Sequence, residues 1–185
     1  MRQPKRPPNA GALIYFRSSL LAVSDAFTSS PSPPPVSSPD ALWSGHLRAP
    51  GTPHSLPLIR QMIEEAAQNA GLDPESVAKI EMAVGEACTN IIEHSYATHS
   101  PSAPLLDIDV FAAQFRDRFE VTIQDYSSIN FAMGDAPTFG DLDDWIATGK
   151  RRGLGIWIIQ SFVDKVEHRF VCGQGNELKL TKYVA

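Results

Sequence analysis

The segment from residue 73 to residue 96 reads DPESVAKIEMAVGEACTNIIEHSY and combines a helix start with two stripes of different chemistry. Asp73 suits the cap position before a helix, Pro74 suits the first helical position, and Glu75 suits the first turn. Apolar side chains then recur at helical spacing, at positions 77, 80, 84, 88 and 91. The segment therefore predicts a long helix with one face against a core.

A second stripe on this helix is polar. Glu86, Asn90 and His94 follow one another at intervals of four residues, so they border the apolar face. A carboxylate can act as a general base, and a carboxamide oxygen suits a hard cation such as Mg²⁺. From these three residues alone, the ordinary alternative of a solvated helix flank is favoured.

The patterns around this helix predict the order β-α-α-β-β-loop-α-β-β. The first helix ends at Gly71, and two strands meet at a tight turn around residues 116–118. In the second of these strands, apolar and polar residues alternate, so we expect one face in the core (Phe119, Val121 and Ile123) and one in solvent (Glu120, Thr122 and Gln124). We expect an α+β fold: a two-layer α/β sandwich with a mainly antiparallel sheet of about five strands and three main helices. The remaining expected elements are a strand ending at Pro50, a helix led by Gly153 with residues 156, 159, 162 and 163 inward, and a final hairpin turning at residues 173–175.

Composition divides the chain into two parts. Residues 1–43 are rich in Pro and Ser and are predicted to be a disordered N-terminal extension, while residues 44–185 carry the regular patterns of one domain. Arg17, Ser18 and Ser19 interrupt the early apolar run, so we expect no secretory leader. The two cysteines lie in apolar runs, which favours reduced core thiols and a cytoplasmic protein.

The charge and hydropathy patterns exclude two classes of partner. The net charge is −5, with no basic block long enough for direct nucleic-acid binding. No apolar run approaches the roughly 20 residues that span a bilayer, so no membrane segment is expected.

Two further segments could contact a ligand. Asp125 ends a predicted strand, where its carboxylate could accept a hydrogen bond from an exocyclic amine, although an Asp that forms a turn is common. In KRRGLGI, Lys150, Arg151 and Arg152 precede Gly153, Leu154 and Gly155 at a helix start. Free N–H groups, glycines and cations together suit phosphate, and a solvated basic run before a helix is the alternative.

Taken together, the three segments resemble the anti-sigma-factor serine/threonine kinases, small relatives of the ATP-binding domains of histidine kinases and gyrase. EACTNIIEHSY resembles the N-box of that family, and GLGIWIIQSFVDKVEH resembles its glycine box. Asp125 falls where the family has its D-x-G box. The resemblance covers about residues 44 to 185 and implies the histidine-kinase-like ATPase fold.

The resemblance implies ATP and Mg²⁺ as cofactors and a role for each matching position. Glu86 would be the catalytic base, Asn90 would hold Mg²⁺, and Asp125 would bind the adenine amine. Phosphate transfer rests largely on such positioning and charge neutralisation. Arg60, on the first helix, matches more loosely an arginine that contacts protein partners. The remaining cofactor-binding positions would be His94, Ser127, Lys150, Arg152, Gly153, Leu154 and Gly155, with residues 134–152 as a lid.

The resemblance also implies partners and excludes related enzymes. The partners would be a STAS-domain anti-anti-sigma protein, a sigma factor and a second copy of the chain as a homodimer. No dimerising phospho-histidine helix pair is expected before the domain, and no transducer domain after it, so a histidine kinase, a chaperone or a topoisomerase is disfavoured.

The sequence departs from the family pattern at the expected adenine end. Ser127 stands where the family has the glycine of its D-x-G box, and a Cβ there could narrow the pocket. Asn176 stands where relatives often have threonine. These departures leave open a second reading, in which the chain is a non-catalytic partner-binding module, either nucleotide-gated or nucleotide-free.

Overall fold

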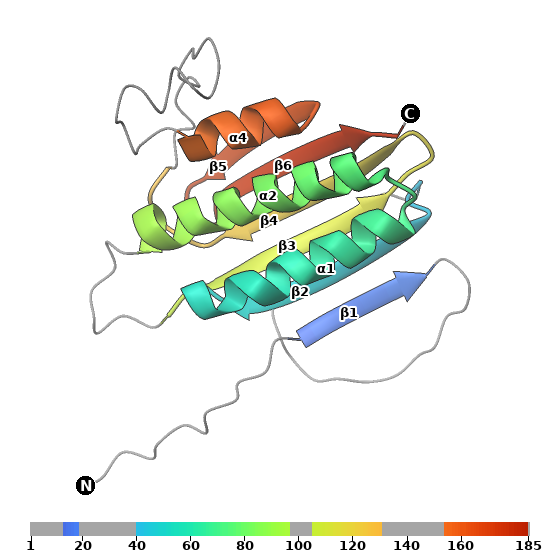
Figure 1. The fold of residues 1–185 in the computed structure, drawn as a ribbon. Coiled ribbons are helices and arrows are strands. Elements are labelled where there is room, and N and C mark those ends of the chain that lie inside the picture. Colours follow the sequence, from blue (N-terminus) through green and yellow to red (C-terminus); the bar gives the residue numbers. More distant parts are fainter. Residues whose placement is uncertain (1–12, 19–39, 97–104, 131–153, 185) are drawn as a thin grey trace, which may run out of the picture.

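Among the residues that the structure describes, a six-stranded antiparallel sheet in the order β1-β2-β3-β4-β6-β5 forms one layer, and three helices lie side by side over one of its faces (Figure 1). The structure is a computed structural model that describes residues 13–18, 40–96, 105–130 and 154–184. The strands are β1 (Leu13–Ser18), β2 (Trp43–Pro50), β3 (Asp107–Gln114), β4 (Arg118–Asp125), β5 (Lys165–Val171) and β6 (Gly175–Tyr183). The helices are α1 (Leu56–Asn69), α2 (Pro74–Asn90) and α4 (Leu154–Phe162), with short helical turns η1 (Pro53–Ser55) and η2 (Ile91–Tyr96).

Local chemistry sets the ends of the first two helices as predicted. Oδ1 of Asp73 accepts hydrogen bonds of 3.0 Å from the backbone N–H groups of Glu75 and Ser76, which caps α2. Gly71 follows α1 with a φ of +81°, a conformation that glycine adopts without strain. After Asn90, the helix widens into η2, in which each turn holds more residues than in an α-helix.

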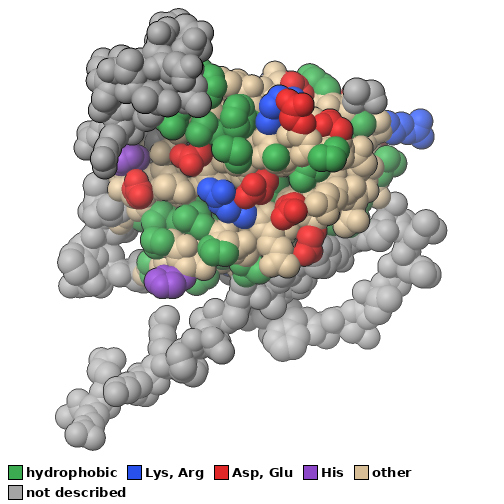
Figure 2. Space-filling view, in the orientation of Figure 1, with side chains coloured by type: hydrophobic (Ala, Val, Ile, Leu, Met, Phe, Trp, Pro, Cys, Tyr) green, Lys and Arg blue, Asp and Glu red, His purple; other side chains and the backbone are tan. Residues whose placement is uncertain are grey.

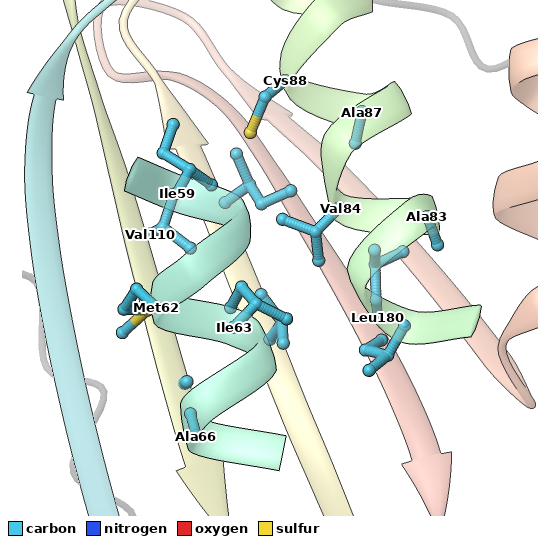
Figure 3. Close-up of a cluster of buried hydrophobic side chains, with 14 of the residues drawn as sticks. Ile59, Met62, Ile63, Ala66, Ala83, Val84, Ala87, Cys88, Val110 and Leu180 are labelled. Carbon is cyan, nitrogen blue, oxygen red and sulfur yellow. The ribbon is translucent and has the colours of Figure 1, made fainter. Parts of the chain in front are cut away.

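The core lies between the helices and the sheet (Figure 3). From α1, Ile59 and Ile63 point toward the sheet, and from α2 Val84 does the same. Each fully buried aliphatic side chain of this kind contributes about 1.5–3 kcal/mol relative to exposure. The predicted apolar stripe of α2 is confirmed, because all five of its members are buried: Val77, Ile80, Val84, Cys88 and Ile91.

The central strands bring the ends of three chain segments together. In the register, Ile108 of β3 lies opposite Asp125 of β4, and Asp125 lies opposite Asn176 of β6. The predicted burial of Phe119, Val121 and Ile123 is confirmed.

Two other burial predictions are wrong. Thr122, expected to be solvated, is buried, because Phe111 and Lys179 flank it on the neighbouring strands. Cys172 is exposed, because it lies just past the end of β5, beyond the cover of the core.

β1 adds a strand that was not expected from the sequence. It pairs antiparallel with β2, from Leu13 opposite Arg48 to Ser18 opposite Trp43. The sequence LIYFRS is rich in the apolar and aromatic residues that suit strands, and it lies within the predicted disordered extension. The start of the domain at residue 44 stays a prediction.

In α4, Ile159 and the following Val163 are buried as predicted, while Ile156 and Phe162 are half-buried. The helix lies over β5 and β6 at one side of the layer, where fewer neighbours cover it (Figure 1). None of the helices within the described residues is both long and apolar enough to cross a membrane.

Candidate functional site

α2 and α4 meet where the polar stripe of α2 faces the start of α4. A Cβ placed on Gly155 would lie 2.9 Å from Oε2 of Glu86 and 3.5 and 3.6 Å from the side-chain nitrogen and oxygen of Asn90. These three predicted site residues are therefore in contact. The absence of a side chain at Gly155 is what leaves room for the Glu86 carboxylate.

The side chain of Asn90 carries a buried donor that finds no partner in the part of the chain that the structure describes. Its Nδ2 is shielded from solvent, and within the described residues it makes no hydrogen bond. An unsatisfied buried polar group of this kind costs about 1–3 kcal/mol, so it calls for a specific explanation. A ligand that approaches between α2 and α4 would supply the missing partner.

The donor set suits Mg²⁺ held mainly by phosphate. Mg²⁺ keeps several waters and takes few protein ligands when substrate phosphates coordinate it. Asn90 offers one amide oxygen, and Glu86 lies in contact with the same glycine. Within the described residues no group of three His, Cys, Asp or Glu side chains could hold a metal ion without such a ligand. The residues fit an ion that arrives with a polyphosphate.

His94 does not continue the polar stripe as regularly as predicted. It lies in η2, where the wider winding changes the direction of successive side chains, and its side chain is exposed. Its contact with a nucleotide stays a prediction.

Asp125 is the centre of a buried hydrogen-bonded cluster at the end of β4. Only 1% of its surface is exposed. Its Oδ1 accepts a hydrogen bond of 2.8 Å from the backbone N–H of Ser127, and both carboxylate oxygens lie 3.1 Å from Nδ2 of Asn176. A carboxylate has about four acceptor positions. Oδ2 therefore keeps capacity for one more donor.

Ser127 and Asn176, the two departures from the family pattern, contact each other. Nδ2 of Asn176 lies 3.4 Å from Oγ of Ser127 and donates to the carbonyl of Ile129 at 2.9 Å. The Ser127 hydroxyl in turn donates to the same carbonyl at 3.0 Å. Nε2 of His168 lies 3.1 Å from Oδ1 of Asn176, and because an amide oxygen only accepts, this ring nitrogen is the donor. The two departures thus form one network around Asp125.

Arg60 lies flat against α2, beside the site. Its Nη1 donates to Glu81 at 3.1 Å, and a Cβ on Gly85 would lie 2.5–2.7 Å from the guanidinium atoms. Gly85 immediately precedes Glu86, so Arg60 occupies a space that only glycine leaves at this position. Figure 2 shows this helical face, with acidic side chains spread around basic ones.

A thiol and a phenol near the site are both neutral at physiological pH. Burial raises the pKa of the Cys88 thiol to about 12, although Arg60 partly opposes the shift. Burial also raises the pKa of Tyr96 above its usual range. Neither group supplies a negative charge to the α2 helix.

The predicted cations and lid lie outside the described residues. This applies to Lys150, Arg151, Arg152 and Gly153, and to the lid at residues 134–152. Leu154 and Gly155 begin α4 and are half-buried.

Three residues at the site were not predicted from the sequence: Tyr96, Gly85 and His168. Tyr96 stands two residues after His94 in the N-box segment, which was the only sequence indication for it. Gly85 and His168 contact residues of other elements, and no local sequence pattern predicts such contacts.

Comparisons with known proteins identify the family of the chain. The histidine kinase-like ATPase domain family matches residues 49–182. Serine-protein kinase RsbW of Bacillus licheniformis is 22% identical over 143 residues, which cover 75% of this chain and 84% of the relative. Serine-protein kinase RsbW of Bacillus subtilis is 25% identical over 143 residues with the same coverage.

A solved structure shares the fold. The crystal structure of the RsbU and RsbW domains of Rv1364c from Mycobacterium tuberculosis matches with a TM-score of 0.51 and 19% identity. The match covers 75% of this chain and 31% of that longer chain. The predicted fold and the predicted resemblance are both confirmed.

Proposed function

Because the chain belongs to the histidine kinase-like ATPase domain family, we propose that it is a protein serine/threonine kinase of the anti-sigma-factor type. It binds Mg-ATP between α2, the start of α4 and the end of β4. The observation that carries this proposal is the buried side-chain nitrogen of Asn90, which has no partner among the described residues and lies beside Glu86 and Gly155.

The phosphates lie at the start of α4. Gly155 lets a phosphate oxygen approach the helix, whose N–H groups and dipole favour negative charge. Oδ1 of Asn90 would hold Mg²⁺, which would neutralise phosphate charge. Lys150, Arg152, Gly153 and Leu154 are the further phosphate contacts that we expect, with residues 134–152 as the lid and His94 near the site.

The adenine lies at the other end, against Asp125. The Ser127 N–H and the Asn176 amide hold the carboxylate in place, and its Oδ2 accepts a hydrogen bond from the exocyclic amine. Ser127 lies beside the adenine. Because its hydroxyl already donates a hydrogen bond to the carbonyl of Ile129, that donor is not offered to the ligand.

Glu86 removes the proton in the transfer step. The hydroxyl oxygen of a serine or threonine forms a bond to the γ-phosphorus as the bond from that phosphorus to the β–γ bridging oxygen breaks. The hydroxyl proton goes to the Glu86 carboxylate, and ADP leaves with the bridging electrons.

We further propose that the substrate is a STAS-domain anti-anti-sigma protein in the cytoplasm, and that the chain also binds a sigma factor and forms a homodimer. Arg60 lies on the outer surface of α1 and α2, where a partner could reach it, and it is the partner-binding residue that we propose.

A second candidate is a partner-binding module without catalysis. The observation that favours it is the network of Ser127 and Asn176, which already occupies three acceptor positions of Asp125. If the adenine cannot bind to Asp125, the chain would still bind its partner but would not transfer phosphate.

The test is transfer of radiolabelled γ-phosphate from ATP to STAS-domain proteins of the source organism. We expect labelling of a serine or threonine by the parent and a loss of at least about 100-fold in Glu86→Gln, since a positioned base contributes about that much. Glu93→Gln, at an exposed carboxylate three residues beyond Asn90, is the matched control and should label as the parent does.

The two candidates give different outcomes. Partner binding without any transfer by the folded parent favours the module. Equal transfer by the parent and Glu86→Gln removes Glu86 from the mechanism.

A further inference from the structure

Tyr96 ends the helical segment that carries Glu86 and Asn90, and it is almost fully buried. Its hydroxyl donates a hydrogen bond of 2.8 Å to the carbonyl of Asp107, at the start of β3. The same hydroxyl accepts a hydrogen bond of 3.2 Å from the backbone N–H of Tyr126, just after β4. One side chain thus joins the end of the helix to two neighbouring strand ends.

Gly51 provides the space for the ring of Tyr96. A Cβ on Gly51 would lie 2.3 and 2.4 Å from two ring carbons and 2.8 Å from the carbonyl of Leu106. The N–H of Gly51 donates to that carbonyl at 2.8 Å, so the backbone behind the ring is itself fixed. The ring is held between β2 and the segment that leads into β3.

The contact with Tyr126 reaches Asp125 in one further step. Tyr126 lies between Asp125 and Ser127, and the Ser127 N–H donates to the Asp125 carboxylate. Fixing the Tyr126 N–H therefore fixes the turn that orients this carboxylate. The other end of the connection is the helix that carries Asn90, six residues before Tyr96.

We propose that Tyr96 is a positioning residue that sets the placement of Asp125 relative to Glu86 and Asn90, so that one nucleotide can contact both. This inference rests on the proposed function. ATP would engage Asp125 with its base and Asn90 with its phosphates, and simultaneous binding at two points depends on their separation. Tyr96 links the two elements through the hydrogen bonds of its hydroxyl and the packing of its ring.

The test is the affinity for Mg-ATP of Tyr96→Phe, Asp125→Asn and the double variant. Tyr96→Phe keeps the ring and removes only the hydroxyl; we expect about tenfold weaker binding. If Tyr96 acts through Asp125, the double variant should bind within about twofold of Asp125→Asn. Effects that simply multiply would indicate a general structural role and overturn the inference. Tyr183→Phe, at an exposed tyrosine, is the matched control.

Other outcomes separate the inference from the proposed function. A parent that binds no Mg-ATP overturns both. A parent that binds, with Tyr96→Phe binding equally well, overturns the inference alone. If Tyr96→Phe does not fold, amide hydrogen exchange in the parent decides. Mg-triphosphate at the Asn90 end should then slow exchange of the Tyr126 amide by at least about threefold, and an unchanged rate contradicts the coupling.

Discussion

Substituting Gly155 by alanine should leave the stability of the fold almost unchanged while it lowers the rate of phosphate transfer strongly. The new Cβ would lie 2.9 Å from Oε2 of Glu86, about 0.5 Å short of ordinary contact at 3.4 Å. The Glu86 carboxylate is the far end of a flexible side chain, so it can move at little cost. Alanine also favours helix over glycine by up to about 1 kcal/mol. The variant should therefore be as stable as the parent, within about 1 kcal/mol.

The same displacement should reduce activity strongly. The new methyl group would push the Glu86 carboxylate away from the attacking hydroxyl. It would also occupy the space in which we propose that a phosphate approaches the helix. A misplacement of about 1 Å can cost on the order of 100-fold in rate. We expect kcat for phosphate transfer to fall about 100-fold and ATP affinity to fall about tenfold.

Urea unfolding and single-turnover phosphate transfer are the two measurements. Gln160→Ala, at an exposed position of the same helix, is the control and should leave both values unchanged. A folded Gly155→Ala variant with parental kcat and ATP affinity would refute the placement of the phosphates at the start of α4.

Three further predictions concern other parts of the molecule. Burial disfavours the charged form of Asp109, yet hydrogen bonds from His46, Arg48 and Tyr126 hold its pKa at about 2, below the usual 3.8. Because the folded pKa is the lower one, this stabilisation, about 2 kcal/mol, is complete above pH 4 and lost as pH falls through about 2. Asp109→Asn should therefore lower the free energy of unfolding at pH 7 and flatten its dependence on pH between 4 and 2, as urea titrations at each pH would show. Iodoacetamide at pH 8 should label the exposed Cys172 and spare the buried Cys88, and labelling of Cys88 detected by mass spectrometry would contradict a closed core. Gly85→Ala should displace the Arg60 guanidinium. We expect partner binding, measured by pull-down, to weaken about tenfold, and ATP affinity, measured by calorimetry, to stay within about threefold of the parent. Parental partner binding by this variant would contradict the partner role of Arg60.

The elements of the fold follow largely from local patterns. The cap formed by Asp73 and the apolar stripe of α2 depend on residues close to one another in the sequence, so a single sequence predicts them. β1 escaped prediction because its pairing with β2 depends on a segment about 30 residues away, across a Pro- and Ser-rich stretch. Thr122 escaped prediction because its cover comes from neighbouring strands.

The sequence predicts only part of the site. The periodicity of α2 predicts that Glu86 and Asn90 share a stripe, and the structure adds that Gly155 touches both. The role of Asn176 as the residue that holds Asp125 requires the pairing of β4 with β6, which the sequence does not state. The Tyr96 hydroxyl contacts are likewise tertiary.

The most direct test of the account is calorimetric titration of Mg-ATP into the parent protein and into Asn90→Ala. We expect binding on the order of micromolar for the parent and at least about tenfold weaker binding for the variant, because the substitution would remove the proposed contact of Asn90 with the metal and phosphates. Absence of binding by the folded parent, or equal binding by Asn90→Ala, would contradict the proposed Mg-ATP site between α2 and α4.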